Sequence, residues 1–216
     1  MELISIALVS LCLIFDVTYF VKVGLQCLPY LLGFKKKIRD VHEDVESYGI
    51  CLPFDLDYML HMNHGKYLRS FEYARGVFVG DTGLLDFVLD LRKTNRNFVI
   101  AAMAIRYRKP VTCFETYKII TKLVLAEDRH LFFEQWLVGI KDEFIKAACY
   151  CKVTMTQSGD LREILQARGI EPRVFCGPIT EDLHHFIELN RASSEKLNPT
   201  RGALKVEQKK PTKKEE

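Results

Sequence analysis

Several motifs that mark common enzyme classes are missing from this sequence of 216 residues. There is no G-x-S-x-G, which argues against a serine hydrolase with a nucleophile elbow. There is no H-E-x-x-H and no phosphate-binding glycine loop, so neither a zincin metal site nor a P-loop is predicted. We therefore expect neither a metal nor a cofactor.

Paired cysteine motifs are also missing. The 7 cysteines are scattered, their number is odd, and no C-x-x-C occurs. This pattern predicts neither a zinc site nor a disulfide framework, and it is typical of small apolar side chains in a reducing compartment. There is no N-x-[ST] acceptor, because Asn198 is followed by Pro199, and this favours the cytosol over a secretory lumen.

The sequence also lacks the charge pattern of a broad basic surface. The net charge is +3, and much of the basic excess lies in residues 35–39 and in the C-terminal tail. Nucleic-acid binding needs an extended basic surface, so we do not expect a nucleic-acid partner. The distribution suits a membrane-proximal segment and a solvated tail.

What the sequence does have is an apolar N-terminus. Residues 3–21 form an apolar run of about bilayer length, interrupted by Asp16, and a second apolar stretch covers residues 23–34. The positive charge follows the run, which predicts a cytosolic protein body. We assign residues 1–34 to a membrane anchor and residues 35–46 to a basic, polar linker.

The alternative for this N-terminus is a signal peptide, which would make the protein secreted after cleavage. A signal peptide normally has a positive start and small residues before the cut. This sequence has Glu2 at its start and no A-x-A site, so the anchor is favoured. Asp16 would be costly at membrane depth, and it fits better at the cytosolic edge of a short span.

The C-terminus ends in Lys213-Lys214-Glu215-Glu216. Two lysines in these positions resemble the dilysine retrieval signal of endoplasmic reticulum membrane proteins, which is read from the cytosolic side. This agrees with the topology expected from the charges. The alternative is that residues 193–216 are only a disordered, charged tail.

Between these ends, the pattern changes from helix to strands. Tyr67, Phe71, Ala74 and Phe78 have helical spacing and predict a helix over residues 63–79, followed by a shorter one over 84–91. Strand-like runs then dominate, and terminal helices are expected at 161–167 and 179–197. The expected strands cover residues 50–54, 98–107, 111–126, 131–140 and 144–156.

Tight charged turns between long strands predict an antiparallel sheet, whose apolar face the long helix must cover. The fold class is therefore α+β, with one domain over residues 47–192 that includes the terminal helices.

The most informative segment is residues 54–75, FDLDYMLHMNHGKYLRSFEYAR. It resembles the signature of the hotdog-fold acyl-thioesterases, D-x-D-x-x-x-H-x-N-N-x-x-Y-x-x-x-x-E-x-A-R. The matching positions are Asp55, Asp57, His61, Asn63, Tyr67, Glu72 and Arg75. The resemblance covers roughly residues 45–192 and implies an antiparallel sheet wrapped around one long helix. It also implies a homodimer with active sites at the subunit seam and an acyl-CoA or other acyl thioester as substrate.

The resemblance implies roles for four residues. Asp57 would be the catalytic carboxylate, as nucleophile or as general base, and the backbone N–H of His64 would polarise the thioester carbonyl. His61 and Asn63 would complete the site. The alternatives are structural: Asp57 as a helix cap, His61 as a structural histidine, and Asn63 as a cap or turn residue.

Two further groups of charged residues lie near this segment or after it in the sequence. Arg106, Arg108 and Lys109 are candidates for contacting CoA phosphates, or they form a solvated strand end. Glu72 is expected to form an ion pair with Arg69 or Arg75 rather than to act in catalysis.

The sequence also departs from the family pattern. Met59 and Leu60 replace a common Asn and Gly, and His64 replaces the second Asn of the N-N pair. Two functions follow. One is an acyl-CoA thioesterase at the endoplasmic reticulum membrane, acting in lipid metabolism. The alternative is a catalytically silent hotdog module that binds acyl chains or lipids and acts through partners in membrane lipid homeostasis.

Overall fold

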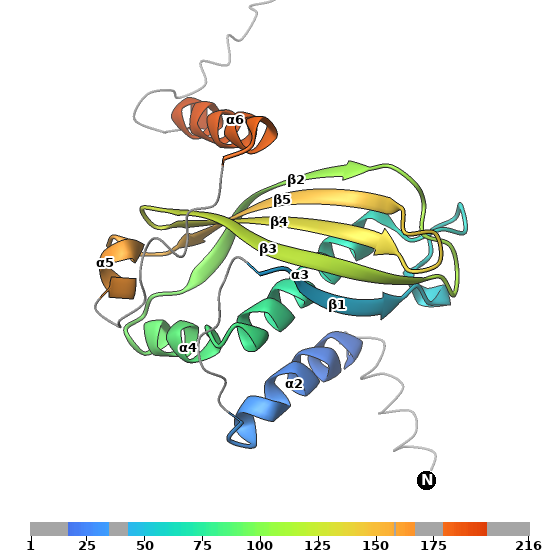
Figure 1. The fold of residues 1–216 in the computed structure, drawn as a ribbon, viewed down its shortest axis with the longest axis horizontal. Coiled ribbons are helices and arrows are strands. Elements are labelled where there is room, and N and C mark those ends of the chain that lie inside the picture. The colour runs from blue at the N-terminus through green and yellow to red at the C-terminus, as the bar shows by residue number, and fades with distance from the viewer. Residues whose placement is uncertain (1–16, 35–42, 158, 167–178, 198–216) are drawn as a thin grey trace, which may run out of the picture. The chain divides into compact units, whose positions relative to one another are not determined.

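A computed structural model describes residues 17–34, 43–157, 159–166 and 179–197. Its strands form one antiparallel sheet in the order β1-β3-β4-β5-β2 (Figure 1). The strands are β1 (Val45–Ile50), β2 (Phe98–Tyr107), β3 (Thr116–Glu127), β4 (His130–Gly139) and β5 (Ile145–Met155). The helices are α2 (Val17–Leu31), α3 (His64–Asp81), α4 (Leu85–Lys93), α5 (Leu161–Gln166) and α6 (Glu181–Leu197), with a 3-10 turn at Pro53–Asp55.

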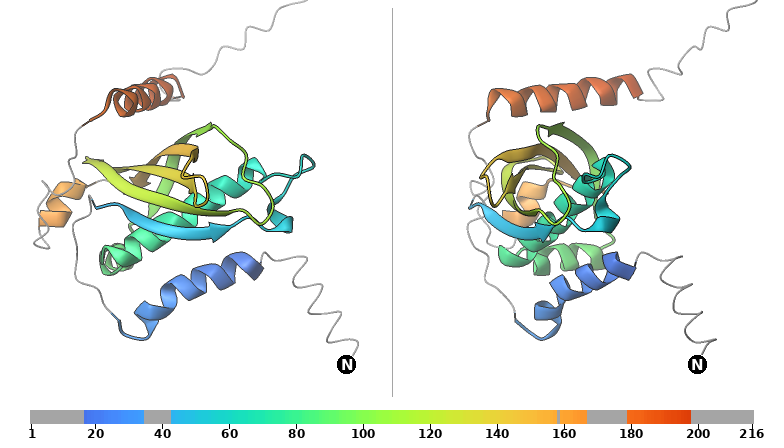
Figure 2. Two further views of the ribbon diagram at one scale, coloured as in Figure 1. Left: turned by 45° about the vertical axis from the view of Figure 1, so that its right-hand side comes forward. Right: turned by 90° about the vertical axis from the view of Figure 1, so that its right-hand side faces the viewer.

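The sheet curls around α3, as the end-on view in Figure 2 shows. The predicted apolar stripe of this helix is its buried face: Tyr67, Phe71, Ala74 and Phe78 are all in the core. Inward-facing side chains of β3, β4 and β5 pack against this stripe, because alternate residues of a strand point to one face. This confirms the α+β class and the hotdog arrangement.

Two strand boundaries differ from the prediction. The first strand was expected at residues 50–54, but β1 ends at Ile50, and Pro53 begins a 3-10 turn because it fixes φ and lacks an N–H. The third strand was expected from residue 111, but β3 begins at Thr116. The preceding residues form a turn in which the Glu115 side chain accepts hydrogen bonds from Thr112.

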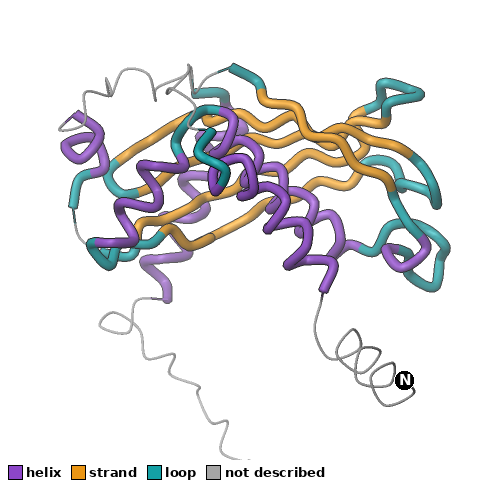
Figure 3. Tube along the Cα trace, turned by 90° about the horizontal axis from the view of Figure 1, so that it is seen from below, coloured by secondary structure: helices purple, strands orange, loops and turns teal. Residues whose placement is uncertain are grey.

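Helix α2 packs on the side of α3 turned away from the sheet (Figures 1 and 3). The Tyr19 hydroxyl donates to Glu72 (3.0 Å), and Gln26 Nε2 donates to the Tyr73 carbonyl (3.1 Å). The described part of the predicted anchor therefore contacts the protein body. The remainder, residues 1–16, lies outside the described residues.

Over the described ranges, no helix has the length and apolar character needed to cross a bilayer. Helix α2 has 15 residues and includes Pro29. Its outer side carries exposed apolar side chains: Phe20, Val21, Leu25 and Leu28. The helix is thus amphipathic, with one face on α3 and one apolar face uncovered by the described residues.

The chain divides into two compact units, residues 1–178 and 179–216. The second unit contains α6, which confirms the helix predicted at 179–197. The first unit contains the sheet, α2 to α5 and every residue of the candidate site. The residues assigned to the linker and the tail lie largely outside the described ranges.

Candidate active site

The segment between the 3-10 turn and α3 forms a tight hairpin. The Asp57 N–H donates to the His61 carbonyl, and the Leu60 N–H donates to the Asp57 carbonyl, both at 3.0 Å. Leu60 has a φ of 60°, a conformation that costs energy for a residue with a Cβ. The common Gly at this position would adopt it readily, so the replacement by Leu60 leaves local strain in the turn.

The hairpin holds the Asp57 carboxylate beside His61. Oδ1 of Asp57 accepts from the Met59 N–H at 2.9 Å, and Oδ2 lies 3.5 Å from Nδ1 of His61. The Asp57 side chain is 13% exposed. A carboxylate that accepts from the N–H two residues later stabilises the turn, so part of the role of Asp57 is structural.

Asp55, the other acid of the pair, is placed differently. Its Oδ2 accepts from the Leu52 N–H at 3.0 Å, and its Oδ1 lies 3.2 Å from the ammonium of Lys66. Its carbonyl accepts from the Asn63 N–H. Asp55 therefore ties the 3-10 turn to the start of α3, and Asp57 is the acid left beside the histidine.

Asn63 caps α3, as the structural alternative predicted. Its Oδ1 accepts from the Gly65 N–H at 2.9 Å, and its carbonyl accepts from the Lys66 N–H at 2.8 Å. The N–H of His64, at the first helical position, has no acceptor among the described residues. The first N–H groups of a helix carry partial positive charge, so this free donor is suited to a developing oxyanion.

A pocket of about 260 Å³ opens beside this helix start. It is lined by His61, Met62, His64, Tyr67, Tyr107, Arg108, Lys109 and Pro110. The structure thus brings together two of the predicted site residues, His61 and His64, with two of the predicted phosphate contacts. Asp57 adjoins the pocket through His61, whereas Arg106 is not among the lining residues.

Two tyrosines form a wall of this pocket. The Tyr107 ring lies edge-on to the His64 ring at 4.5 Å and to the Tyr67 ring at 5.1 Å between centroids. The Tyr67 hydroxyl accepts from the Val111 N–H, and burial raises the pKa of Tyr67 to about 12. Burial raises the pKa of Tyr107 as well, so both rings stay neutral at physiological pH. The position of Tyr107, at the end of β2, carried no signal in the sequence.

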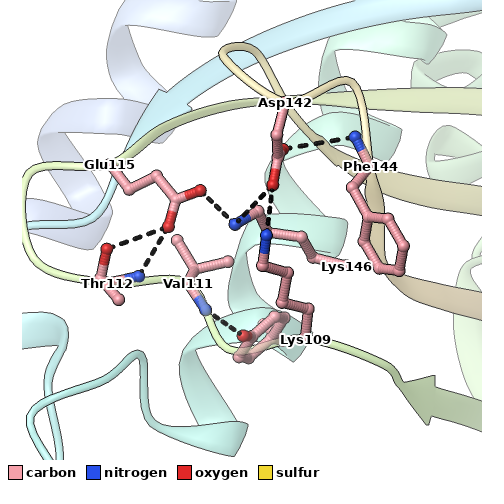
Figure 4. Close-up of polar contacts among 8 residues, drawn as sticks. Lys109, Val111, Thr112, Glu115, Asp142, Phe144 and Lys146 are labelled. Atoms are coloured by element: carbon pink, nitrogen blue, oxygen red, sulfur yellow. Dashed lines mark hydrogen bonds and ion pairs between the residues drawn. The ribbon is translucent and has the colours of Figure 1, made fainter.

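The basic residues at the pocket rim already have neighbours. Lys109 Nζ lies 2.7 Å from Asp142 Oδ2 (Figure 4). The Arg108 guanidinium lies over the Phe144 ring, 4.7 Å from its centroid. A cation stacked on an aromatic ring keeps its hydrogen-bond donors available. Arg108 is therefore better placed than Lys109 to bind an added anion.

Behind Lys109 lies an ion-pair network around the buried Lys146. Lys146 is 2% exposed, and its ammonium contacts Glu115 and lies 3.6 Å from Asp142 (Figure 4). The hydrogen bond from Lys109 is the main cause that lowers the pKa of Asp142 to about 2. Burial opposes ionisation of Glu115, but bonds from Lys146 and Thr112 outweigh it and leave its pKa below the ordinary value.

Glu72 was expected to pair with Arg69 or Arg75, and the structure has no ion pair between Glu72 and Arg75. Glu72 accepts from Tyr19 on α2, while Arg75 Nη1 donates to Oε1 of Gln135 on β4 at 2.6 Å. Arg75 points into the sheet because it lies on the buried face of α3.

The part of the chain that the structure describes contains no group of three or more His, Cys, Asp or Glu side chains arranged to hold a metal.

Known sequences match the part of the chain that contains the candidate site. The family model described as the thioesterase-like superfamily matches residues 51–171. A protein from Danio rerio named Protein THEM6 is 33% identical over 193 residues, which cover 87% of this chain and 90% of the relative. A Drosophila melanogaster protein of the same name is 31% identical over 194 residues, covering 89% of this chain and 96% of the relative.

Solved structures show the same fold at low identity. A hypothetical protein from Staphylococcus aureus, SAV2348, solved in complex with CoA, has a TM-score of 0.53 and 11% identity, covering 65% of this chain and 90% of that one. A thioesterase from Synechocystis that acts on 1,4-dihydroxy-2-naphthoyl-CoA has a TM-score of 0.50 and 8% identity, covering 58% and 94%. The sequence matches, the hotdog sheet and the motif at residues 54–75 all point to one family, and the chain belongs to the thioesterase-like superfamily.

Proposed function

We propose that this protein hydrolyses acyl-CoA thioesters to the free acid and CoA. The observation that carries the proposal is the free N–H of His64 at the start of α3, next to the Asp57–His61 pair. Thioester hydrolysis needs a carboxylate to attack or to activate water, and a donor for the carbonyl oxygen. The hairpin and the helix start supply these two groups from neighbouring positions.

The reaction would proceed through an oxyanion held by the His64 N–H. Either Asp57 takes a proton from a water that attacks the carbonyl carbon, or its carboxylate attacks and forms a mixed anhydride that water then cleaves. In both cases the C–S bond breaks and CoA leaves as a thiolate, which is then protonated. His61, 3.5 Å from Asp57, would hold the carboxylate in place.

A single-turnover reaction in ¹⁸O-labelled water separates activation of water by Asp57 from a route in which water cleaves the anhydride at the aspartyl carbon. If Asp57 activates water, the labelled oxygen enters the acid product in the first turnover. If Asp57 attacks and water then cleaves the anhydride at the aspartyl carbon, the first product is unlabelled and the label appears in Asp57. Mass spectrometry of the acid and of the peptide containing Asp57 measures both.

The pocket at the end of β2 would take the CoA moiety. Arg108 is stacked on Phe144 and Lys109 is paired with Asp142, so Arg108 is the first candidate for a CoA phosphate, with Lys109 and Arg106 around it. Guanidinium groups bind phosphate oxygens through paired donors. Support comes from the Staphylococcus aureus neighbour of the same fold, which was solved in complex with CoA.

We also propose a homodimer. Strand β2 lies at one end of the described sheet, and Val99 and Ile100 on it are each 48% exposed. A long edge strand with apolar side chains is a ready pairing surface. Pairing of two copies along β2 would place the pocket that contains Tyr107 and Arg108 at the seam. Sedimentation of the wild-type protein beside a Val99→Lys/Ile100→Lys variant tests this.

The proposed location is the endoplasmic reticulum membrane, with the hotdog domain in the cytosol. The apolar N-terminal run, the basic residues after it and the terminal Lys213-Lys214 support it. The exposed apolar side of α2 suits the same surface, since amphipathic helices lie in membrane interfaces. An intact N-terminus in the membrane fraction supports the anchor, whereas a shortened N-terminus in the medium would favour secretion.

A second candidate function is binding of an acyl chain or lipid without turnover. It is favoured by the surroundings of Asp57: both carboxylate oxygens already have neighbours in the hairpin, as a purely structural aspartate would. The test is hydrolysis by the full-length protein across short to long acyl-CoAs, beside Asp57→Ala. Turnover that is lost in Asp57→Ala supports the enzyme, and a folded protein without turnover on every chain length supports the binding module.

A further inference from the structure

A second and larger cavity lies at the other end of α3. Its volume is about 410 Å³, within the range of ~300–1,000 Å³ that is usual for ligand pockets. Apolar side chains from α3 and α4 form one wall, including Val79 and Phe87, and side chains of the sheet form another, including Leu123 and Phe133. Residues of α2 also line this cavity, which we call the Arg75 pocket.

The guanidinium of Arg75 is the unusual group in this apolar pocket. Arg75 is 7% exposed and lines the pocket. Its Nη1 donates to Gln135, whereas its Nη2 is buried and has no hydrogen-bond partner. No carboxylate among the described residues lies within ion-pair distance of Arg75. A buried charge without a counter-ion is strongly unfavourable, so an anion in the pocket would be well stabilised.

The neighbouring groups do not supply the missing negative charge. Gln135 is neutral, and its amide nitrogen donates to the Phe71 carbonyl and to the Thr121 hydroxyl, at 3.0 Å each. Burial raises the pKa of the Cys149 thiol to about 12, so it is uncharged at neutral pH although Arg75 acts in the opposite direction. Glu72 lines the pocket, but its carboxylate accepts from Tyr19 on α2 and forms no ion pair with Arg75.

We propose that the Arg75 pocket binds a long-chain fatty acid anion, with its carboxylate on the Arg75 guanidinium and its alkyl chain along the apolar walls. A carboxylate fits the paired donors of a guanidinium, and an alkyl chain fits walls without further polar demands. The bulky, charged head of an acyl-CoA has no counterpart in this pocket. The site is separate from Asp57, so it does not depend on hydrolysis.

The test measures displacement of a fluorescent fatty acid from the full-length protein in lipid nanodiscs, with empty nanodiscs as background. The competitors are hexadecanoate, hexadecanol and hexadecanoyl-CoA. We expect hexadecanoate to bind at least about tenfold more tightly than the alcohol, because only the acid can pair with Arg75. Equal affinities for acid and alcohol in the wild-type protein would overturn the proposal.

Two pairs of variants locate the site. Arg75→Met should make acid and alcohol bind equally, while Arg75→Lys should keep part of the preference for the acid. At Gly80, which also lines the pocket, an added Cβ meets no heavy atom within 4 Å. Gly80→Leu should therefore fill the space and weaken hexadecanoate binding at least about tenfold, because the alkyl chain loses contacts of several methylene groups. Gly80→Ala adds only one methyl group and should leave the affinity unchanged.

Gly80→Leu keeps the proposal testable if Arg75→Met does not fold, because leucine also favours the helix. Unchanged hexadecanoate affinity in a folded Gly80→Leu protein would overturn the proposal. Asp57→Asn should bind hexadecanoate as the wild-type protein does. A loss of binding in Asp57→Asn would place the fatty acid at the hydrolytic site instead and would also overturn it.

Discussion

The Nδ1 atom of His61 lies 3.5 Å from Oδ2 of Asp57, across a turn that their own backbone groups close. The hairpin holds the pair, and a bridge from His61 to Thr112 ties the hairpin to the segment before β3. Because Asp55 is two residues away and makes purely structural contacts, it provides a matched control for Asp57.

Asp57→Asn should lower turnover of acyl-CoA by about 10²–10⁴-fold, the usual loss when a general base is removed. The amide can still accept from the Met59 N–H, so the hairpin should persist. Asp55→Asn should lower stability but keep turnover within a few-fold of wild type. Rates of CoA release, together with circular dichroism, measure both. Equal losses in the two variants would contradict the assignment.

Asn63→Ala should lower the free energy of unfolding by about 1 kcal/mol, since it removes the side-chain acceptor for the Gly65 N–H. Asn63→Asp, which keeps an acceptor at the helix start, should be close to wild type in stability. Urea denaturation measures both variants. A destabilisation shared equally by the two variants would show that the amide has a role other than capping.

Gln135→Leu should destabilise the protein by about 1–3 kcal/mol or more, because it leaves the buried Arg75 guanidinium without its partner. The double variant Arg75→Met/Gln135→Leu should recover part of that loss, since a buried polar pair can be replaced by apolar side chains. A double-mutant cycle by denaturation measures the coupling. Additive losses would contradict the link between the two residues.

The Asp142 network predicts a loss of stability in acid. The pKa of Asp142 is about 2, below the ordinary 3.8, so its ion pairs stabilise the fold fully above 3.8. As the pH falls from about 4 to 2, the unfolded state binds the proton first and this contribution is lost. Asp142→Asn and Lys109→Met should both flatten stability over this window, as measured by thermal unfolding at each pH. A curve identical to wild type would contradict the prediction.

The sequence predicted elements well where the signals lie within one short segment. Strand β2 has the predicted ends, and α3 differs from its prediction by a few residues, because its apolar stripe and its cap are both local signals. The boundaries that failed lie at residues 50–54 and 111–115. In both places a proline and side-chain hydrogen bonds to the backbone compete with an apolar run that reads as strand.

For the candidate site, too, local features could be predicted from the sequence and long-range contacts could not. Asp57, His61, Asn63 and His64 come from one continuous motif, so their proximity could be predicted. The contact between Arg75 and Gln135 joins residues 60 positions apart, and the placement of Tyr107 depends on how β2 ends beside α3. The docking of α2 on α3 depends on the tertiary packing too, because an apolar helix near a basic segment has the same local pattern whether it enters lipid or packs on protein.

The edge position of β2 has a kinetic consequence. The pocket beside α3 is built partly from Tyr107, the last residue of this strand, and from Arg108 just after it. If two copies pair along β2, every association event completes two pockets and every dissociation event opens both. Specific activity would then rise with enzyme concentration and level off, and dilution would inactivate the protein reversibly without unfolding it.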